Sequence, residues 1–494
     1  MRRTIAIFSL CWGAALFLCP RPGAAQAIPA ALARDLDQWY GHATQAAPGQ
    51  WGVAIANAAG EVLWSANPDE PLLPASTAKI FTTGFARSIV GPDATLPTRV
   101  VGLGHVDSAG TWQGAWTLEL NGDPTFERTL RSGRMLRQLT AQLHALGVRT
   151  LIGALTTTSA NGRTATVIPA AWDGRYPGEL YAPPIGAVTL HENTVSITAR
   201  PGRKLGDPPE VVFTIPAGLE SMVRVEASTA AGSARHLHMA ATGDGGWTIT
   251  GSIGLSARPQ GFSAVAEDPE QVLECAWGAA LERAGIAWDR GRVTPRTSPD
   301  DAPAVLAEVS SPPFDSIASE VNRRSLNVGA ELLLRWAAGA GHGPERLTRH
   351  VRQVVGPAAV VELHDGSGLS PDDRVAARTE ALYLAQLPRR PGAEEFPLLL
   401  PANGMGTLRR LGRGVLAPGV VRAKTGTLDS VSALAGYLGR RDGVLVISAL
   451  YNGARARTAK RAQWALFRLL GAGGVDLATA GSETQLGGDE AGSP

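Results

Sequence analysis

The sequence predicts an α/β (α+β) fold in which helices flank an antiparallel sheet and a β-rich segment interrupts the chain. Three observations support this prediction. Apolar residues recur every four positions at Phe81, Phe85 and Ile89, which is the spacing of a helix with one buried face. Strand-like runs joined by short turns fill the segment 420–450. Between about 90 and 305, short alternating runs are separated instead by Gly, Pro and Asp.

A β-hairpin is expected before the Phe81 helix. Trp51, Val53 and Ile55 alternate with smaller residues, and Val62 and Trp64 continue the alternation after a turn rich in Asn, Ala and Gly. Helical apolar patterns then return in three later segments. These further helices are expected at 132–146, 314–338 and 376–388.

Residues 1–27 are expected to be a secretory signal peptide. Two arginines at 2–3 precede an apolar stretch at 5–18, and an Ala-x-Ala cleavage pattern follows at 25–27. The apolar stretch is shorter than the ~20 residues that span a bilayer. We therefore expect an exported protein, periplasmic or extracellular, without a transmembrane anchor once the signal is removed.

The charge balance and the cysteines exclude several classes of protein. The chain has 46 Lys and Arg against 44 Asp and Glu, and removal of the leader makes the balance nearly neutral, which gives no reason to expect nucleic acid binding. Cys11 and Cys19 lie in the leader, so Cys275 would remain alone and no intramolecular disulfide is expected. Stability must then come from burial of the 44% of residues that are hydrophobic.

A serine and a lysine lie three positions apart where the Phe81 helix is expected to begin. Pro74 is typical of a first helical turn, which places Ser76 in that turn and Lys79 on the same face. A serine hydroxyl becomes a nucleophile when a neighbouring base removes its proton, and lysine can do so once its pKa is lowered. The pair indicates nucleophilic catalysis, although so short a pattern also arises by chance.

The scarcity of lysine supports this interpretation. Only four lysines occur, against 42 arginines, and arginine cannot act as a base. A chain so rich in arginine is expected to keep lysine where arginine would fail. The lysines lie at 79, 204, 424 and 460.

Ser325 and Asn327 form a second polar pattern. Ser325-Leu326-Asn327 falls between two predicted helices, on a tight connection that can present both polar side chains to a cleft. The plainer interpretation is a helix cap, because Ser and Asn are both favoured there.

A third pattern, Lys424-Thr425-Gly426-Thr427, lies in a predicted strand. Its glycine would let a substrate backbone approach a strand edge closely, and its lysine and threonines would supply donors for an anion. A lysine on an exposed strand is again the plainer interpretation.

Together, S-x-x-K, S-x-N and K-T-G occur in the order and in the structural contexts of the motif triplet of the penicillin-recognising serine enzymes. The chain resembles that superfamily. The 249 positions from Ser76 to Ser325 make it similar to the low-molecular-mass class C penicillin-binding proteins, the type-4-like D-alanyl-D-alanine carboxypeptidase/endopeptidase family. Supporting matches are NGDPT at 121–125, NRRSLNVGAE at 322–331, DGSGLS at 365–370, GTL at 406–408 and RAKTGTL at 422–428.

The resemblance implies a β-lactamase/transpeptidase-like domain that cleaves peptidoglycan peptides through an acyl-enzyme and binds β-lactams. Ser76 is then the nucleophile, Lys79 the base and Ser325 a proton relay. No cofactor or metal is implied. The residues implied in substrate binding are Asn327, Lys424, Thr425, Gly426 and Thr427.

The resemblance also implies a divided catalytic domain. It would comprise 28–89 and 306–471, interrupted at 90–305 by one or two β-rich modules, the inner one at roughly 193–262. A disordered tail is expected at 472–494, which is rich in small and acidic residues. Because every assigned residue lies outside the insertion, we expect the insertion to orient a bulky substrate and to take no part in bond making.

Two other functions share these motifs. A β-lactamase would carry the same triplet, but the long insertion favours a peptidase. A non-catalytic peptidoglycan-binding scaffold would keep the fold, but the intact Ser76 and Lys79 argue against it. The sequence leaves open the preference for carboxypeptidase or endopeptidase activity, the dibasic residue of the peptide, the oligomeric state, the role of the insertion modules and the route of export.

Overall fold

The computed structural model describes residues 28–128, 135–160, 166–291, 302–339 and 341–477. The expected signal peptide therefore lies outside the described residues. The nine α-helices in the described part of the chain are α1 (Ala30–Ala46), α2 (Ala78–Val90), α3 (Met135–Ala145), α4 (Pro269–Arg283), α5 (Phe314–Arg324), α6 (Asn327–Ala338), α7 (Gly343–Val355), α8 (Ala377–Gln386) and α9 (Ala456–Gly471).

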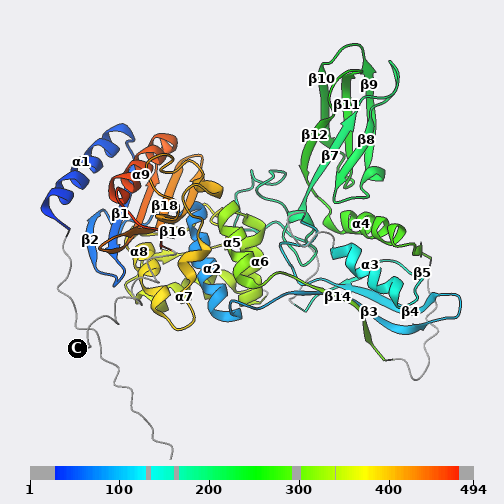
Figure 1. Ribbon diagram of the computed structural model, residues 1–494, viewed down its shortest axis with the longest axis horizontal. Coiled ribbons are helices and arrows are strands. Elements are labelled where there is room, and N and C mark those ends of the chain that lie inside the picture. Colours follow the sequence, from blue (N-terminus) through cyan, green and yellow to red (C-terminus); the bar gives the residue numbers. More distant parts are fainter. Residues whose placement is uncertain (1–27, 129–134, 161–165, 292–301, 340, 478–494) are drawn as a thin grey trace, which may run out of the picture.

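A five-stranded antiparallel sheet forms the centre of the larger unit (Figure 1). The helices α1 and α9 cover one face, and α2, α8 and their neighbours α5 to α7 cover the other. Helices on both faces of an antiparallel sheet confirm the α+β fold class. In spatial order the strands are β17 (Val421–Leu428), β18 (Val431–Arg440), β19 (Gly443–Asn452), β1 (Gln50–Asn57) and β2 (Val62–Ala66).

The first strand shows why both faces of this sheet are apolar. Trp51, Val53 and Ile55 pack under α1 and α9, whereas Ala54 faces the helices on the other side. Six consecutive residues of β1 are buried, so the alternation in the sequence separates large from small residues and not buried from exposed ones. The small side chains lie on the face against which α8 packs.

The helix predicted from Phe81 begins later than expected. A 3₁₀ turn at Ala75–Thr77 precedes α2, which starts at Ala78. Phe81 and Phe85 are buried as predicted, but Ile89 is 51% exposed because it lies one residue before the end of the helix. The prediction for Ile89 is therefore wrong.

The inserted segment has its own cores. Its larger sheet packs against α3 and α4, and β14 returns beside β3, so the two chain crossings to the central domain are neighbours. This sheet extends to residue 310, beyond the expected boundary at 305. Its strands are β3 (Pro97–Val106), β4 (Thr111–Glu119), β5 (Thr150–Ile152), β6 (Thr157–Thr158), β13 (Ala287–Asp289) and β14 (Ala304–Ser310).

Two three-stranded sheets form the inner part of the insertion and project away from the central domain (Figure 1). They enclose a separate apolar cluster that contains Trp247 and Ile249. Their strands span 194–265, where the sequence predicted a module at roughly 193–262. They are β7 (Thr194–Arg200), β8 (Glu210–Ile215) and β12 (Gln260–Val265) in one sheet, and β9 (Val223–Ala230), β10 (Arg235–Ala241) and β11 (Trp247–Gly254) in the other.

Near the C-terminus, residues 472–477 follow α9 and lie along the central sheet. The Val475 amide donates to the Gly439 carbonyl at 3.1 Å, and the Leu477 amide donates to the Gly419 carbonyl at 3.3 Å. The rest of the expected tail lies outside the described residues. A short pair of strands, β15 (Val361–Glu362) and β16 (Arg374–Val375), completes the fold.

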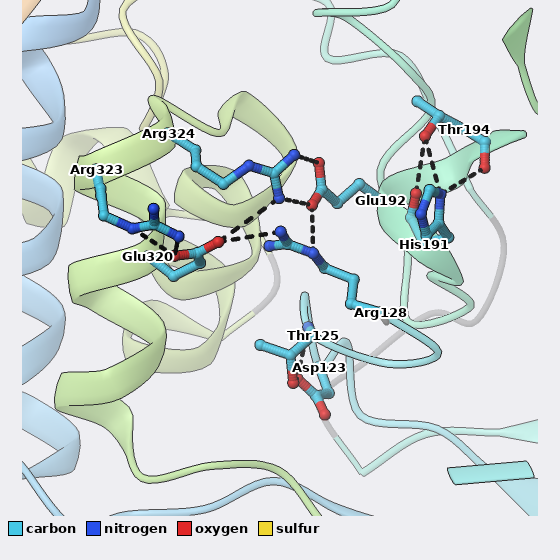
Figure 2. A network of polar contacts seen from close by, with 9 residues as sticks. All are labelled: Asp123, Thr125, Arg128, His191, Glu192, Thr194, Glu320, Arg323 and Arg324. Atoms are coloured by element: carbon cyan, nitrogen blue, oxygen red, sulfur yellow. Dashed lines mark hydrogen bonds and ion pairs between the residues drawn. The ribbon is translucent and has the colours of Figure 1, made fainter. Parts of the chain in front are cut away.

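A network of ion pairs joins the insertion to α5 (Figure 2). Arg128 and Glu192 belong to the insertion and lie 2.8 Å apart, and Arg128 also reaches Glu320 of α5 at 3.0 Å. Arg324, the last residue of α5, pairs with Glu192 at 2.6 Å. The Arg128 and Glu192 side chains are only 9% and 14% exposed. Removing either residue would therefore leave the other as a buried charge without this partner, which is destabilising.

The Glu192 backbone is held in an uncommon conformation. His191, Glu192 and Asn193 have φ of 47°, 64° and 53°, in the left-handed region that costs a non-glycine residue about 1 kcal/mol or more each. The Asn193 side chain stabilises this turn, because Nδ2 donates to the Pro184 carbonyl at 2.9 Å and Oδ1 accepts from the Leu190 amide at 3.1 Å. The turn presents the Glu192 carboxylate to α5.

Replacing Glu192 with alanine should lower the free energy of unfolding by about 1 to 3 kcal/mol, because the buried Arg128 and the partly exposed Arg324 both lose a carboxylate partner. Urea unfolding followed by tryptophan fluorescence measures this change. The matched control is Glu210→Ala. Glu210 pairs with Arg200 on an exposed surface, where solvent screens the two charges and the ion pair contributes little to stability. Equal losses in the two variants would contradict a stabilising role for the network.

Candidate active site

Ser76 lies in the 3₁₀ turn that leads into α2. It is partly exposed, whereas both of its neighbours, Ala75 and Thr77, are buried. Ala75 has a φ of 48°, which an alanine adopts only when its surroundings impose it. The Thr77 hydroxyl donates to the Pro74 carbonyl at 2.9 Å and closes the turn. The serine is thus the residue of this turn that a substrate can reach.

Lys79 lies one helical turn further along and is fully buried. Its Nζ donates to Ser76 Oγ at 3.0 Å, to Asn327 Oδ1 at 2.6 Å and to the Ser367 carbonyl at 2.5 Å. Burial lowers the pKa of Lys79 to about 8, and the carboxyl groups of Asp365 and Glu331 oppose part of that shift. An amine with this pKa is a competent base near neutral pH.

The Ser325 pattern connects α5 to α6 as predicted. Ser325 has φ 62° and ψ 45°, the left-handed conformation that ends α5, and α6 begins two residues later at Asn327. The Ser325 hydroxyl accepts a hydrogen bond from Lys424 Nζ at 2.8 Å. Asn327 contacts Lys79 through Oδ1 and donates from Nδ2 to the Tyr181 carbonyl at 2.8 Å. The two polar residues therefore face different partners within one site.

Strand β17 borders the same site as the edge strand of the central sheet. Lys424 is fully buried and donates to the Thr425 carbonyl at 2.7 Å as well as to Ser325. Burial, reinforced by the charge of Lys79, lowers the pKa of Lys424 well below its usual value. Thr427 is exposed, so its hydroxyl and amide are available to a ligand that adds to this edge.

Gly426 allows β17 to approach the Ser76 turn closely. A Cβ at this position would lie 2.5 Å from the Pro74 carbonyl oxygen and 3.1 Å from the Ala75 Cβ. Neither atom belongs to a flexible side-chain end, so a larger residue would push the strand away from the nucleophile. The glycine of the K-T-G pattern thus has a packing reason inside the protein, in addition to the predicted approach of a substrate.

The 365–370 loop, which the sequence matched without assigning a role, contributes a backbone acceptor to the site. Ser367 presents its carbonyl to Lys79, and Gly368 packs so closely on the Ser76 turn that a Cβ would lie 1.9 Å from the Ala75 oxygen. The Asp365 carboxylate holds the loop by accepting from several of its amides. The DGSGLS motif at 365–370 marked this loop as similar to the family, but the sequence did not predict that the loop contacts Lys79.

Two further buried carboxyl groups lie near Lys79. Glu331 Oε1 accepts from the Gly366 amide at 2.9 Å, and burial, with the charge of Asp365, raises its pKa to about 8. Burial likewise raises the pKa of Asp373 well above its usual value. Both shifts favour the neutral, protonated carboxyl, which limits the negative charge that would otherwise favour a protonated Lys79.

The structure brings together every residue that the sequence singled out. A hydroxyl next to a buried amine, a second serine bonded to a second lysine, and an open strand edge can perform acyl transfer. Among the described residues, no cluster of His, Cys, Asp and Glu is arranged to hold a metal ion.

Comparison with known proteins gives three findings. A model of the D-Ala-D-Ala carboxypeptidase 3 (S13) family matches residues 33–471. A D-alanyl-D-alanine carboxypeptidase of Actinomadura sp. (strain R39) is 30% identical over 423 residues, covering 81% of this chain and 77% of the relative. The crystal structure of penicillin binding protein 4 (dacB) from Haemophilus influenzae superposes with a TM-score of 0.67 at 20% identity, covering 86% of this chain and 99% of that one.

Replacing Gly426 with alanine should slow covalent labelling by fluorescent penicillin about tenfold or more, because the added methyl group displaces β17 from Ser76. Time-resolved gel fluorescence measures the rate. The matched control is Gly261→Ala on the inner module, where a Cβ would meet nothing closer than 3.9 Å. Labelling of Gly426→Ala at the control rate would show that the close approach is not required.

Proposed function

Since the chain belongs to the D-Ala-D-Ala carboxypeptidase 3 (S13) family of serine hydrolases, we propose that Ser76 cleaves the terminal D-alanyl-D-alanine bond of peptidoglycan peptides. The observation that carries the proposal is the contact of a fully buried amine, Lys79 Nζ, with Ser76 Oγ at 3.0 Å. The S-x-N pattern at Ser325 and the K-T-G pattern at Lys424, which lie around this pair, are typical of penicillin-binding enzymes.

Acylation begins with attack of Ser76 Oγ on the carbonyl carbon of the penultimate D-alanine. The hydroxyl proton passes to Lys79 Nζ, and the carbonyl oxygen becomes an oxyanion that the backbone N–H groups of Ser76 and Thr427 would receive. The C–N bond then breaks as the Ser325 hydroxyl gives its proton to the leaving nitrogen and takes one in turn from Lys424 Nζ, which donates to it at 2.8 Å. D-Alanine therefore departs with a neutral amine. Water afterwards hydrolyses the Ser76 ester and restores the hydroxyl.

The terminal carboxylate of the substrate would bind beside Lys424, with hydroxyl donors from Thr425 and Thr427. Burial lowers the pKa of both Lys79 and Lys424, and the charge of Lys79 lowers the pKa of Lys424 further, so charge on one amine disfavours charge on the other. An anionic carboxylate beside Lys424 favours charge there and, by repulsion, a neutral Lys79. Substrate binding thereby helps to prepare the base.

Asn327, expected to bind the substrate, is assigned a further role in holding Lys79. Both ends of its amide are already engaged, Oδ1 with Lys79 and Nδ2 with Tyr181. Each end keeps one further hydrogen-bonding position, so Asn327 can still contact the peptide amide. Its first task is to hold Lys79.

Cleavage of cross-links would use the same acyl donor. In the endopeptidase reaction too, the nucleophile attacks the carbonyl carbon of a D-alanine whose amide nitrogen belongs to a D-configured residue with a free carboxylate. The two reactions differ in the leaving group, which is D-alanine in one and a larger peptide in the other. The same residues therefore serve both reactions.

As a member of a peptidoglycan-acting family the enzyme is exported, and we propose the periplasm or the cell wall as its location. No described helix is long and apolar enough to cross a membrane.

Replacing Ser76 with alanine should abolish penicilloylation and leave the melting temperature nearly unchanged, because the side chain is small and partly exposed. Mass spectrometry of the intact protein after incubation with penicillin tests this directly. An adduct on the variant would end the assignment of Ser76. A wild-type chain that forms no adduct would favour a non-catalytic scaffold, and rapid turnover of penicillin would favour a β-lactamase.

The acylation rate should rise roughly tenfold per pH unit up to about pH 8 and then level off, because only the neutral form of Lys79 accepts a proton. Stopped-flow acylation with a chromogenic cephalosporin between pH 5 and 9 gives the profile. Lys79→Arg keeps the charge without a usable base, so it should lose the rising limb and about 10² to 10⁴-fold in rate. A flat wild-type profile below pH 8 would require another base.

A further inference from the structure

A lysine that acts as base must aim its lone pair at the proton it removes. Neutral Lys79 has two N–H bonds and one lone pair, and three acceptor atoms surround it. If the N–H bonds point to Asn327 Oδ1 at 2.6 Å and to the Ser367 carbonyl at 2.5 Å, the lone pair is left facing Ser76 Oγ at 3.0 Å. The positions of Asn327 and Ser367 therefore decide whether the amine is aimed correctly.

Asn327 is oriented by the inserted segment. An amide side chain can present either its oxygen or its NH₂ group to a neighbour, and only the oxygen accepts from an amine. The Tyr181 carbonyl accepts from Nδ2 at 2.8 Å, which fixes the NH₂ end and turns Oδ1 towards Lys79. Tyr181 belongs to the insertion, 146 positions before Asn327.

The Ser367 carbonyl is oriented through Asp365. The Asp365 carboxylate is 1% exposed and accepts from the amides of its own loop at 2.6 to 3.1 Å and from Ser367 Oγ at 2.9 Å. It also accepts from Trp172 Nε1 at 3.0 Å, and Trp172 lies in the insertion. A buried carboxylate that loses one donor shifts towards its remaining donors, and these are the amides that set the direction of the Ser367 carbonyl.

The Trp172 side chain is held in place by apolar packing. Its ring is 5% exposed and packs in an apolar cluster with Ile185 of the insertion and with Val328 and Leu332 of α6. The same cluster includes Leu369, whose amide donates to Asp365. The indole thus joins the insertion, α6 and the 365–370 loop at one point.

We propose that Trp172 and the Tyr181 carbonyl are positioning groups for the base, so that the insertion takes part in acylation through Lys79. The inference rests on the proposed function, in which Lys79 is the base. It differs from the expectation drawn from the sequence, under which the insertion serves substrate orientation alone. Each of the two protein acceptors of Lys79 other than Ser76 is oriented by one group of the segment 172–181.

The test is Trp172→Phe in the full chain, which keeps an aromatic ring in the cluster and removes the N–H donor together with part of the indole volume. We expect the acylation rate constant at saturating penicillin to fall about 10- to 100-fold, because the lone pair of Lys79 loses its alignment. The dissociation constant of the preceding non-covalent complex should change less than twofold, because Lys424 keeps its hydrogen bonds to Ser325 and Thr425. A purely structural defect would lower the amount of active protein and leave the rate constant of the remainder unchanged.

The matched control is Trp277→Phe. Trp277 is fully buried in the core of the insertion, and in the described part of the chain its Nε1 has no hydrogen-bond partner. The same truncation there should leave the acylation rate constant at the wild-type value. Equal rate constants in Trp172→Phe and Trp277→Phe would overturn the proposal.

A second variant covers the case in which Trp172→Phe does not fold. Ser367→Ala removes the hydroxyl donor to Asp365 without touching the apolar cluster, and it should also slow acylation at saturating penicillin. A wild-type rate in that variant would overturn the role of Asp365. Failure of the proposed function is distinguishable, because it appears as a wild-type chain without any penicilloyl adduct.

Discussion

Lys79 is enclosed entirely by protein, and an amine removed from water favours its neutral form. The rest of the site depends on this constraint. A solvated lysine at the same position would keep its proton near neutral pH and could not activate Ser76. Burial in turn obliges the protein to satisfy the N–H bonds of the amine, and the acceptors that do so come from Asn327 and Ser367.

Keeping the surroundings of Lys79 nearly neutral requires the buried carboxyl groups to be controlled as well. The Asp365 carboxylate is satisfied by backbone and side-chain donors, whereas burial raises the pKa of Glu331 and of Asp373 and so favours their neutral forms. A second ionised carboxylate nearby would stabilise the ammonium form of Lys79 and weaken the base. The arrangement therefore limits negative charge on one side of Lys79, while Lys424 supplies positive charge on the other.

The insertion contacts the catalytic domain at more than one functional point. Glu192 pairs with Arg324, which directly precedes Ser325, and the segment 172–181 reaches Asn327 and Asp365. A module that touched only the periphery would be free to move relative to the nucleophile. These contacts instead make the geometry of the site depend on the position of the insertion.

Several features were predictable from the sequence, and for local reasons. The α+β fold class and membership of the carboxypeptidase family are confirmed. Three residues along a helical turn place Lys79 beside Ser76, and the Ser325 connection follows from two adjacent helical patterns. The late start of α2 and the exposure of Ile89 were not predicted, because the packing of Gly368 on the Ser76 turn and the end of the helix overrode the apolar periodicity.

By itself, then, the sequence determined the three short patterns from which the candidate site is built, since the members of each pattern are neighbours in one turn or strand. Only the tertiary structure decided which atoms orient the base. Asn327 and Ser367 reach Lys79 from 248 and 288 positions away, and Trp172 reaches Asp365 from 193. Contacts of this kind depend on how separate elements pack, and no local period in the sequence encodes a hydrogen bond between a carbonyl or an indole and a distant partner.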